Sequence, residues 1–266
     1  MNPLTPIIWE SPPPSLVLEH NEVHLWRVQV IGTPERTCLV DKYLSEAEVE
    51  RGRRYYFDHD RDQFLESRIS LRIILGQYLD LSPAVIEFGR GSHGKPNLKP
   101  LSSSGGLSFN LSHSGEIVLI AVGRNREIGV DVEQLRREID LEGIAQRFFS
   151  PREVKELFAL SPELRPGAFF RCWTRKEAYV KARGRGLSIP LNQFDVTLEP
   201  EVYAALQATR DYPDEAEQWA LYNVDLGEDY QAALVVDGVP EQIRFWKFKP
   251  ESMPIRANDE SAVLLS

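Results

Sequence analysis

Two long segments of the chain repeat apolar residues with the period of an α-helix. The first runs from about 60 to 79 and the second from about 167 to 183. One side of the first segment is formed by Phe64, Leu65, Ile69, Ile73 and Leu75. Side chains at spacings of three and four residues share a helix face, so we predict that both segments are helices packed against a core.

Shorter segments alternate apolar and polar residues in the manner of β-strands. In the sequence 129–133, Val130 and Val132 point to one face, and Asp131 and Glu133 point to the other. Two apolar stretches joined by a glycine-containing turn predict a hairpin of 219–224 with 230–236. Further strands are predicted at 85–88, 117–122, 194–198 and 242–248.

The chain contains a diverged internal repeat with an offset of 105 residues. Ser45 is followed three residues later by Glu48, and Ser150 is followed at the same distance by Glu153. This spacing is typical of a helix N-terminus with a capping box. Pro151 favours the second helix start, because the first helical position needs no N–H.

The same offset aligns the two long helices with each other and places Glu177 opposite Arg72. We therefore predict an α+β protein built from two similar halves, with a ligand site in the cleft between them. The predicted units are an extended N-terminal arm (1–19), a first half (20–125), a second half (126–248) and a tail (249–266).

Composition and charge narrow the class of protein. Among 266 residues, 31 Lys and Arg oppose 40 Asp and Glu, and the net charge of −9 argues against a general nucleic-acid binder. No apolar run of about 18 residues predicts a membrane span, and the first ten residues lack the pattern of a secretory signal. Cys38 and Cys172 are too few for a disulfide framework and lack metal-ligand spacing, so we expect a cytoplasmic protein.

Basic residues nevertheless cluster in two short segments. Six arginines lie between 51 and 72, and five Lys or Arg lie between 175 and 185. Two such clusters on an acidic protein indicate a specific anionic ligand or partner. For any single arginine, a solvated helix face is the simpler explanation.

Asp131 and Glu133 are the first candidate site residues. Two carboxylates on one strand face suit Mg²⁺, which commonly takes one or two carboxylates together with phosphate oxygens. A half-exposed strand also turns alternate polar residues outward without any such function. Taken alone, the pattern favours the plain exposed strand.

Glu177 and Lys181 share one face of the second long helix. A carboxylate there could bind a metal or act as a general base, and an ammonium one turn away could neutralise charge on a phosphate. An ordinary surface ion pair has the same spacing and stabilises a helix by only about 0.2–0.5 kcal/mol. The pair alone does not decide between these alternatives.

A third element lies at the turn 109–115, between two predicted strands. Ser112 and His113 could donate hydrogen bonds to phosphate oxygens, or the small side chains could simply bond their own backbone. Lys95, in Gly-Lys-Pro, could meet a phosphate or be a plain loop lysine. No Walker-type glycine loop, G-x-G-x-x-G, G-x-S-x-G or HExxH motif is present.

Taken in order, these motifs resemble the 4'-phosphopantetheinyl transferases of the long, single-chain type. The series is Gly-Lys-Pro (94–96), Phe-Asn-Leu-Ser-His-Ser (109–114), Gly-Val-Asp-Val-Glu (129–133), Phe-Phe-Ser-x-x-Glu (148–153) and Trp-x-x-Lys-Glu-Ala-x-x-Lys (173–181). The resemblance is close over 94–198 and loose over 44–93.

The resemblance implies a fold of two related α+β halves, with coenzyme A and a metal ion between them. It also implies a reaction, in which the phosphopantetheine arm of coenzyme A moves to a serine of an apo acyl or peptidyl carrier protein and 3',5'-ADP leaves. Such carriers belong to fatty-acid, polyketide and peptide synthases. By this likeness Asp131 and Glu133 would hold Mg²⁺, with Mn²⁺ as an alternative, and Glu177 would complete the metal site, act as base toward the serine, or both.

The remaining assignments also come from the likeness. Lys181 and His113 would contact the pyrophosphate, and Ser112 and Lys95 would lie near the adenosine 3'-phosphate. The family uses first-half cations for the same phosphate, but at positions that do not align here. The candidates are Arg51, Arg54, Arg61 and Arg68, of which we prefer Arg51 and Arg68.

Two rival functions stay open at this point. One is a non-catalytic relative that binds coenzyme A or a carrier protein, and the other is a metal-dependent hydrolase of pantetheine phosphodiesters. Intact Asp131, Glu133, Glu177 and Lys181 argue against a pure binding module. We expect a monomer, because two fused halves already build the cleft, and we expect no membrane or nucleic-acid partner. The carrier-docking surface is not predicted.

Overall fold

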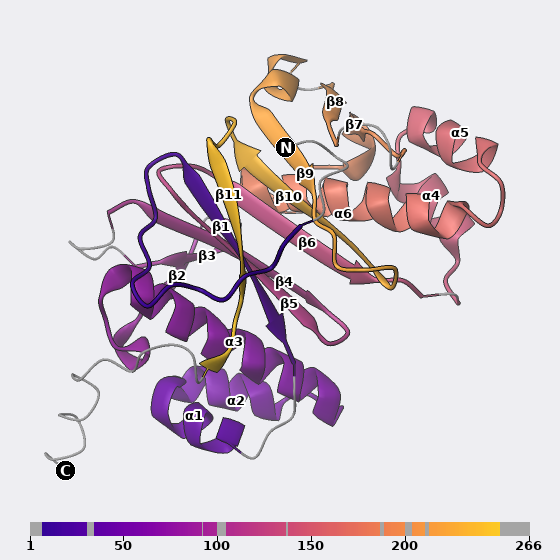
Figure 1. The fold of residues 1–266 in the computed structure, drawn as a ribbon. Helices are drawn as coiled ribbons and strands as arrows, with labels where there is room; N and C mark the ends of the chain where they lie inside the picture. The colour runs from indigo at the N-terminus through magenta and orange to yellow at the C-terminus, as the bar shows by residue number, and fades with distance from the viewer. Residues whose placement is uncertain are drawn as a thin grey trace, which may run out of the picture.

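The computed structural model contains helices and strands in two lobes (Figure 1). It describes residues 7–30, 35–91, 93–99, 105–136, 138–186, 189–199, 204–210 and 213–250. The predicted tail lies outside these residues, apart from 249 and 250. Mixed helix and strand content agrees with the predicted α+β class.

The first half begins with a buried strand and three helices. α2 starts at the predicted capping box, where Glu48 N donates to Ser45 Oγ and Ser45 N donates to the Glu48 carboxylate. α3 matches the first predicted long helix. The elements are β1 (Glu22–Gln29), α1 (Glu35–Tyr43), α2 (Glu46–Arg53), α3 (Asp58–Leu79), η1 (Pro83–Val85), β2 (Phe88–Arg90), β3 (Pro96–Leu98), β4 (Leu107–Ser114) and β5 (Ile117–Arg124).

The second half repeats this plan. α5 also starts at a capping box, formed by Ser150 and Glu153 with Pro151 at the first helical position. The predicted hairpin is present as β9 paired with β10. The elements are β6 (Ile128–Gln134), α4 (Leu141–Phe148), α5 (Pro151–Ala159), α6 (Arg165–Arg183), η3 (Leu191–Gln193), β7 (Phe194–Val196), β8 (Leu206–Thr209), η4 (Pro213–Glu217), β9 (Trp219–Asn223), β10 (Tyr230–Asp237) and β11 (Gln242–Lys247).

The two main sheets have the same internal topology. In the first, β1 pairs with β5 and β5 pairs with β4; in the second, β6 pairs with β10 and β10 pairs with β9. All four pairings are antiparallel, and each long helix falls between the first and second strands of its half. The prediction of two similar halves is therefore confirmed.

The last strand, β11, crosses back to the first half. It pairs in parallel with β1, with Trp26 opposite Trp246. Trp246 and Phe248 are buried in the core cluster that also contains Trp26 and the apolar face of α3. The sheet order thus places 242–247 with the first half, whereas the sequence-based division assigned these residues to the second.

The segment 85–88 is not the strand that its apolar residues suggested. It begins in the 3₁₀ turn η1, and β2 starts only at Phe88. Pro83 has no N–H for a sheet, and the guanidinium of Arg72 donates to the carbonyl oxygens of Pro83 and Ile86. A side chain therefore satisfies the carbonyl groups that a neighbouring strand would otherwise bind.

The two halves meet where the edge strands β4 and β6 lie side by side. Side chains connect these edges: Val130 N donates to Asn110 Oδ1 at 2.9 Å, and Ser114 Oγ donates to Glu133 Oε2 at 3.1 Å. The candidate site residues of both halves therefore gather along one seam between the lobes.

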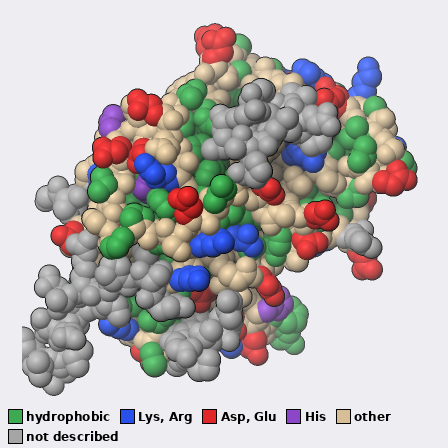
Figure 2. Space-filling model, viewed as in Figure 1, with side chains coloured by type: hydrophobic (Ala, Val, Ile, Leu, Met, Phe, Trp, Pro, Cys, Tyr) green, Lys and Arg blue, Asp and Glu red, His purple; other side chains and the backbone are tan. Residues whose placement is uncertain are grey.

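The surface mixes charges of both signs. On the face in Figure 2, acidic and basic side chains are interspersed. Within the described part of the chain, no helix combines the length and the apolar character needed to cross a bilayer.

Candidate active site

The position of α6 over β6 depends on Gly129, the glycine of the Gly-Val-Asp-Val-Glu motif. A Cβ at this position would collide with the carbonyl oxygen of Ala178 and the amide nitrogen of Ala182. Only glycine lets the helix approach the strand this closely. The close approach brings Glu177 and Lys181 of α6 to the carboxylates of β6.

Lys181, Asp131 and Ser112 form a hydrogen-bonded triangle at the seam. Lys181 Nζ donates to Asp131 Oδ1 at 2.6 Å and to Ser112 Oγ at 2.8 Å, and Ser112 Oγ donates to the same Oδ1 at 2.9 Å. The Asp131 side chain is 6% exposed and the Lys181 side chain is 28% exposed. The ammonium is therefore held by the carboxylate but still reaches solvent.

The other two candidate metal ligands, Glu133 and Glu177, share this end of the site. Burial raises the pKa of Glu133, and the nearby charge of Asp131 raises it further. The pKa of Glu177 is raised by burial and then by Asp131. Because the charge of Asp131 raises the pKa of both glutamates, a cation would be stabilised at this end of the site.

The donor chemistry fits a hard divalent cation. Asp131 Oδ2 is buried and accepts no hydrogen bond among the described residues, while its Oδ1 is already bound by Lys181 and Ser112. Oxygen donors are the ligands that Mg²⁺ takes. No group of three His, Cys, Asp or Glu in the described chain is gathered closely enough to hold a metal by itself. A metal here would therefore share its coordination with a ligand or water, as Mg²⁺ commonly does.

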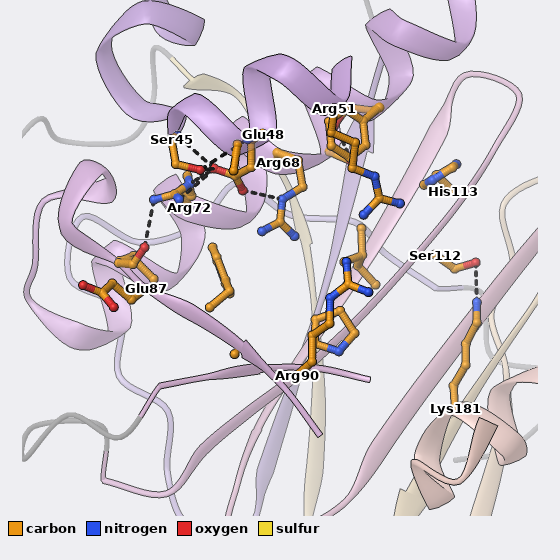
Figure 3. Close-up of a pocket in the computed structure, with 18 of the residues that line it drawn as sticks. Ser45, Glu48, Arg51, Arg68, Arg72, Glu87, Arg90, Ser112, His113 and Lys181 are labelled. Atoms are coloured by element: carbon orange, nitrogen blue, oxygen red, sulfur yellow. Dashed lines mark hydrogen bonds and ion pairs between the residues drawn. The ribbon is translucent and has the colours of Figure 1, made fainter. Parts of the chain in front are cut away.

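These residues form one end of a pocket of about 1020 Å³ that both halves line. Figure 3 shows Ser112, His113 and Lys181 on one side and the arginines of the first half on the other. His113 lies on β4; burial and then the charge of Lys181 lower its pKa. The pocket therefore has three carboxylates with the ammonium of Lys181 at one end, while guanidinium groups lie at the other together with the carboxylates of Glu48 and Glu87.

The opposite wall belongs to α2, α3 and β2. Arg68 Nε donates to Glu48 Oε1 at 2.6 Å, and the guanidinium lies 4.4 Å from the centre of the Phe88 ring. Arg51 also lines the pocket, with its guanidinium 5.1 Å from the Phe64 ring centre. Aromatic rings beside both groups help to hold them at the wall, and Arg68 is also paired with the carboxylate of Glu48.

The structure brings most of the predicted site residues together. The pocket is lined by Arg51, Arg68, Ser112, His113, Asp131, Glu133, Glu177 and Lys181. Lys95 is not part of this lining. Its ammonium donates to Glu127 Oε2 at 2.9 Å and to the carbonyl oxygens of Ile128 and Ala182, both at 3.1 Å. These contacts tie the Gly-Lys-Pro loop to β6 and to the end of α6.

Arg90, Trp173 and Glu48 are among the pocket residues that the sequence analysis did not assign to the site. Arg90 is exposed and lines the pocket from β2, Trp173 lines it from α6, and Glu48 binds the arginines of its wall. Trp173 is the first residue of the last motif and lies one helical turn before Glu177, so its spacing indicated that it could lie on the same helix face as the site. Arg90 and Glu48 gave no such signal, because a lone arginine before a loop and a capping glutamate are both common.

Comparisons with known proteins decide the family. A sequence model described as the 4'-phosphopantetheinyl transferase superfamily matches residues 127–235, and one described as 4'-phosphopantetheinyl transferase, N-terminal, matches residues 32–125. A relative in Nostoc sp., the 4'-phosphopantetheinyl transferase HetI, is 40% identical over 240 residues, covering 90% of this chain and 98% of the relative. The chain belongs to the 4'-phosphopantetheinyl transferase superfamily.

Two other members are similar over most of their length. A 4'-phosphopantetheinyl transferase of Bacillus subtilis is 33% identical over 192 residues, which cover 72% of this chain and 81% of the relative. The transferase Sfp of Bacillus subtilis strain 168 is 31% identical over 203 residues, covering 76% of this chain and 86% of Sfp. The superfamily match contains the candidate metal ligands and Lys181, and the N-terminal match contains the arginine wall.

Proposed function

We propose that this chain transfers the 4'-phosphopantetheine group of coenzyme A to a serine of an apo acyl or peptidyl carrier protein and releases 3',5'-ADP. The proposal is carried by one observation: a single pocket has three carboxylates with an ammonium at one end and guanidinium groups at the other. Coenzyme A has two separate anionic parts, a pyrophosphate and a 3'-phosphate, and the two ends of the pocket suit one part each.

The chemical step needs charge neutralisation and alignment more than covalent help. The serine oxygen forms a bond to the phosphorus that carries pantetheine, and the bond from that phosphorus to the bridging oxygen breaks. The serine proton passes to the carboxylate of Glu177, and 3',5'-ADP is the leaving group. A raised pKa suits Glu177 to this role as general base.

Lys181 and His113 are assigned to the pyrophosphate. The ammonium of Lys181 is fixed by Asp131 and Ser112, so it needs little reorganisation to neutralise charge on the leaving group. His113 lines the same end of the pocket and can donate a hydrogen bond from a ring N–H.

Asp131, Glu133 and Glu177 are assigned to Mg²⁺, with Mn²⁺ as the alternative. The ion would supply a positive charge that neutralises the pyrophosphate. The orphaned Oδ2 of Asp131 supports this assignment, because a buried carboxylate oxygen normally has a partner.

The 3'-phosphate is assigned to Arg51 and Arg68, and the structure suggests adding Arg90, which lines the same wall. The earlier assignment of Ser112 and Lys95 to this phosphate stays a prediction. Their contacts indicate other roles. Ser112 orients Lys181, and Lys95 connects a loop of the first half to the second half.

The carrier protein is the proposed partner, and we expect the chain to act in the cytoplasm as a monomer. The relatives named above are 4'-phosphopantetheinyl transferases by name, which supports the proposed group transfer. Which carrier or pathway is served is not proposed.

Intact mass spectrometry tests the proposed function. An apo carrier protein incubated with the chain, coenzyme A and Mg²⁺ should gain one phosphopantetheine group, and a carrier with its acceptor serine replaced by alanine should gain none. No gain on several unrelated carriers, together with measurable coenzyme A binding, would favour the non-catalytic alternative. Release of phosphopantetheine without any carrier would favour the hydrolase.

A further inference from the structure

The same four-part arrangement occurs once in each half of the molecule. In the first half, Arg72 Nη2 lies 2.7 Å from Oε2 of Glu48, the capping-box glutamate of α2. Arg72 Nη1 donates to the carbonyl oxygens of Pro83 at 2.8 Å and Ile86 at 3.0 Å, the first residue of η1 and the residue that follows it. We call Glu48 and Arg72 the first clamp.

In the second half, Lys176 Nζ lies 2.7 Å from Oε2 of Glu153, the capping-box glutamate of α5. The same ammonium donates to the carbonyl oxygens of Leu191 at 2.7 Å and Phe194 at 2.6 Å, around η3. We call Glu153 and Lys176 the second clamp. Both of its side chains are fully buried.

An aromatic ring completes each clamp. The Arg72 guanidinium lies 5.2 Å from the Phe88 ring centre, and the Lys176 ammonium lies 4.3 Å from that of Phe194. Each clamp therefore joins a capped helix start, the middle of the long helix and the 3₁₀ turn that follows it. Two independent segments of sequence make the same construction.

Protein acceptors take all three N–H groups of Lys176 and four of the five N–H groups of Arg72. The ammonium of Lys176 has three N–H groups, and Glu153, Leu191 and Phe194 accept all three. Arg72 is buried and is bound by Glu48 and two carbonyl groups. We therefore assign neither cation to the pyrophosphate or the 3'-phosphate, although both lie on the helices that supply such ligands.

Glu48 and Arg72 of the first clamp are themselves among the residues that line the pocket, whereas the second clamp only adjoins the lining. Glu177 directly follows Lys176 on α6 and lines the carboxylate end. Arg68 lies one turn before Arg72 on α3, and the other oxygen of Glu48 binds its Nε. Figure 3 shows Glu48 between Arg68 and Arg72, with the terminal nitrogens of Arg68 directed into the pocket.

We propose that the two clamps are separate positioning devices: the first orients Arg68 for a phosphate monoester, and the second sets Glu177 for a divalent cation. The identity of these ligands rests on the proposed function. The clamps act through the neighbouring residue, because their own polar groups are bound to other parts of the protein. Loss of one clamp should therefore weaken one ligand and spare the other.

Measurements of ligand binding can test the roles of the two clamps separately. The variants Glu48→Gln and Glu153→Gln remove one charge while keeping the side-chain shape. We expect Glu48→Gln to weaken binding of 3',5'-ADP, titrated calorimetrically without metal, by about tenfold, as for one weakened charge-assisted hydrogen bond. We expect Glu153→Gln to weaken Mn²⁺ binding, followed by electron paramagnetic resonance, by a similar factor. Each variant should leave the other ligand's affinity within about twofold.

Matched controls lie on the same helices. Glu50 of α2 pairs with Arg53, and Glu156 of α5 pairs with Arg152, both at the surface. Their Gln variants should change neither affinity. If both clamp variants weaken the same ligand, or both keep wild-type affinities and lose only thermal stability, the proposal is wrong. If Glu153→Gln does not fold, Lys176→Arg is titrated in its place. This variant keeps the positive charge but changes the length and shape of the side chain, and the same weakening of Mn²⁺ binding is expected.

Failure of the clamp proposal can be distinguished from failure of the proposed function. Wild-type transfer to an apo carrier is measured on the same preparation. Suppose that the wild type shows no transfer, and that each clamp variant still weakens only its own ligand. The clamp proposal is then supported and the proposed reaction is wrong. If the wild type transfers normally and the titrations do not separate, only the clamp proposal fails.

Discussion

Lys181 Nζ lies 2.6 Å from Asp131 Oδ1 and thereby joins the last turn of α6 to β6 at the seam between the halves. Asp131 supplies the charge that holds the ammonium, and Ser112 fixes its direction. The pair also explains why the motifs Gly-Val-Asp-Val-Glu (129–133) and Trp-x-x-Lys-Glu-Ala-x-x-Lys (173–181) occur together, since each contributes one partner.

The first prediction concerns Lys181. Lys181→Met should lower kcat for transfer on the order of 100-fold or more, because one preorganised charge opposite the pyrophosphate is lost. Steady-state transfer to an apo carrier measures it. Lys247→Met, the same change on the exposed side of β11, is the control and should leave kcat unchanged. Equal activity of the two variants would remove Lys181 from the site.

The second prediction concerns the base. Glu177→Gln should keep affinity for 3',5'-ADP but lower transfer by at least about 100-fold, the usual contribution of a general base. Calorimetry gives the affinity, and mass spectrometry of the carrier gives the rate. Glu156→Gln on α5 is the control. Transfer at the wild-type rate by Glu177→Gln would exclude a catalytic role for this carboxylate.

The third prediction concerns the metal. EDTA should abolish transfer, and added Mg²⁺ should restore it. Asp131→Asn should weaken Mn²⁺ binding by at least about tenfold, because a neutral amide is a poorer ligand for a hard cation than a carboxylate. The exposed Asp214→Asn on η4 should bind Mn²⁺ as the wild type does. Full activity in EDTA would contradict the assignment of all three carboxylates.

Local spacing was sufficient to predict the two long helices, α3 and α6, and the starts of α2 and α5, but not α1 or α4. Both capping boxes are read from four consecutive residues, and the structure contains both. The carboxylates of β6 follow from alternation in the same way. Such features depend on neighbours in the chain, so the sequence displays them directly.

Features that depend on tertiary contacts were not predictable. Lys176 and Lys181 lie five residues apart on one helix, yet the first is fully buried against Glu153 and the second faces the pocket. The repeat offset aligned Glu177 with Arg72, whereas the structural counterpart of Arg72 is Lys176. A shift of one residue turns a helix by about 100°, which exchanges a core position for a pocket position.

The same limit applies to the return of β11 to the first sheet. Its residues read as a strand, but a strand pattern does not say which sheet it joins. Trp246 opposite Trp26 shows the reason for the pairing, since both side chains fill the core beside α3. That contact joins residues more than 200 positions apart, and no local pattern encodes it.

The fourth prediction concerns His24, which lies in this core. Its ring is 1% exposed, with Nδ1 2.7 Å from the hydroxyl of Tyr78 and Nε2 3.4 Å from Glu22. Arg244 and Trp246 face it from β11. Burial lowers the pKa of His24 from 6.5 to about 4, although Glu22 opposes the shift.

The lowered pKa makes His24 a source of acid sensitivity. Between pH 6.5 and 4 the unfolded chain binds a proton at His24 that the folded protein does not. Above pH 6.5 His24 is neutral in both states, so its contribution to the free energy of unfolding is fully present. As the pH falls to 4, the free energy of unfolding should decrease by at most about 3 kcal/mol. Urea unfolding at pH 4.5–6.5, above the range where the paired Glu22 titrates, measures this slope.

His24→Gln keeps a hydrogen-bonding side chain beside Tyr78 but cannot titrate. We expect this variant to be less stable than the wild type at pH 7, with a flatter dependence on pH between 4.5 and 6.5. His20 is exposed just before β1, so His20→Gln should keep the wild-type slope. If His24→Gln also keeps that slope, another buried group binds the proton, and the acid sensitivity does not come from the core beneath β1 and β11.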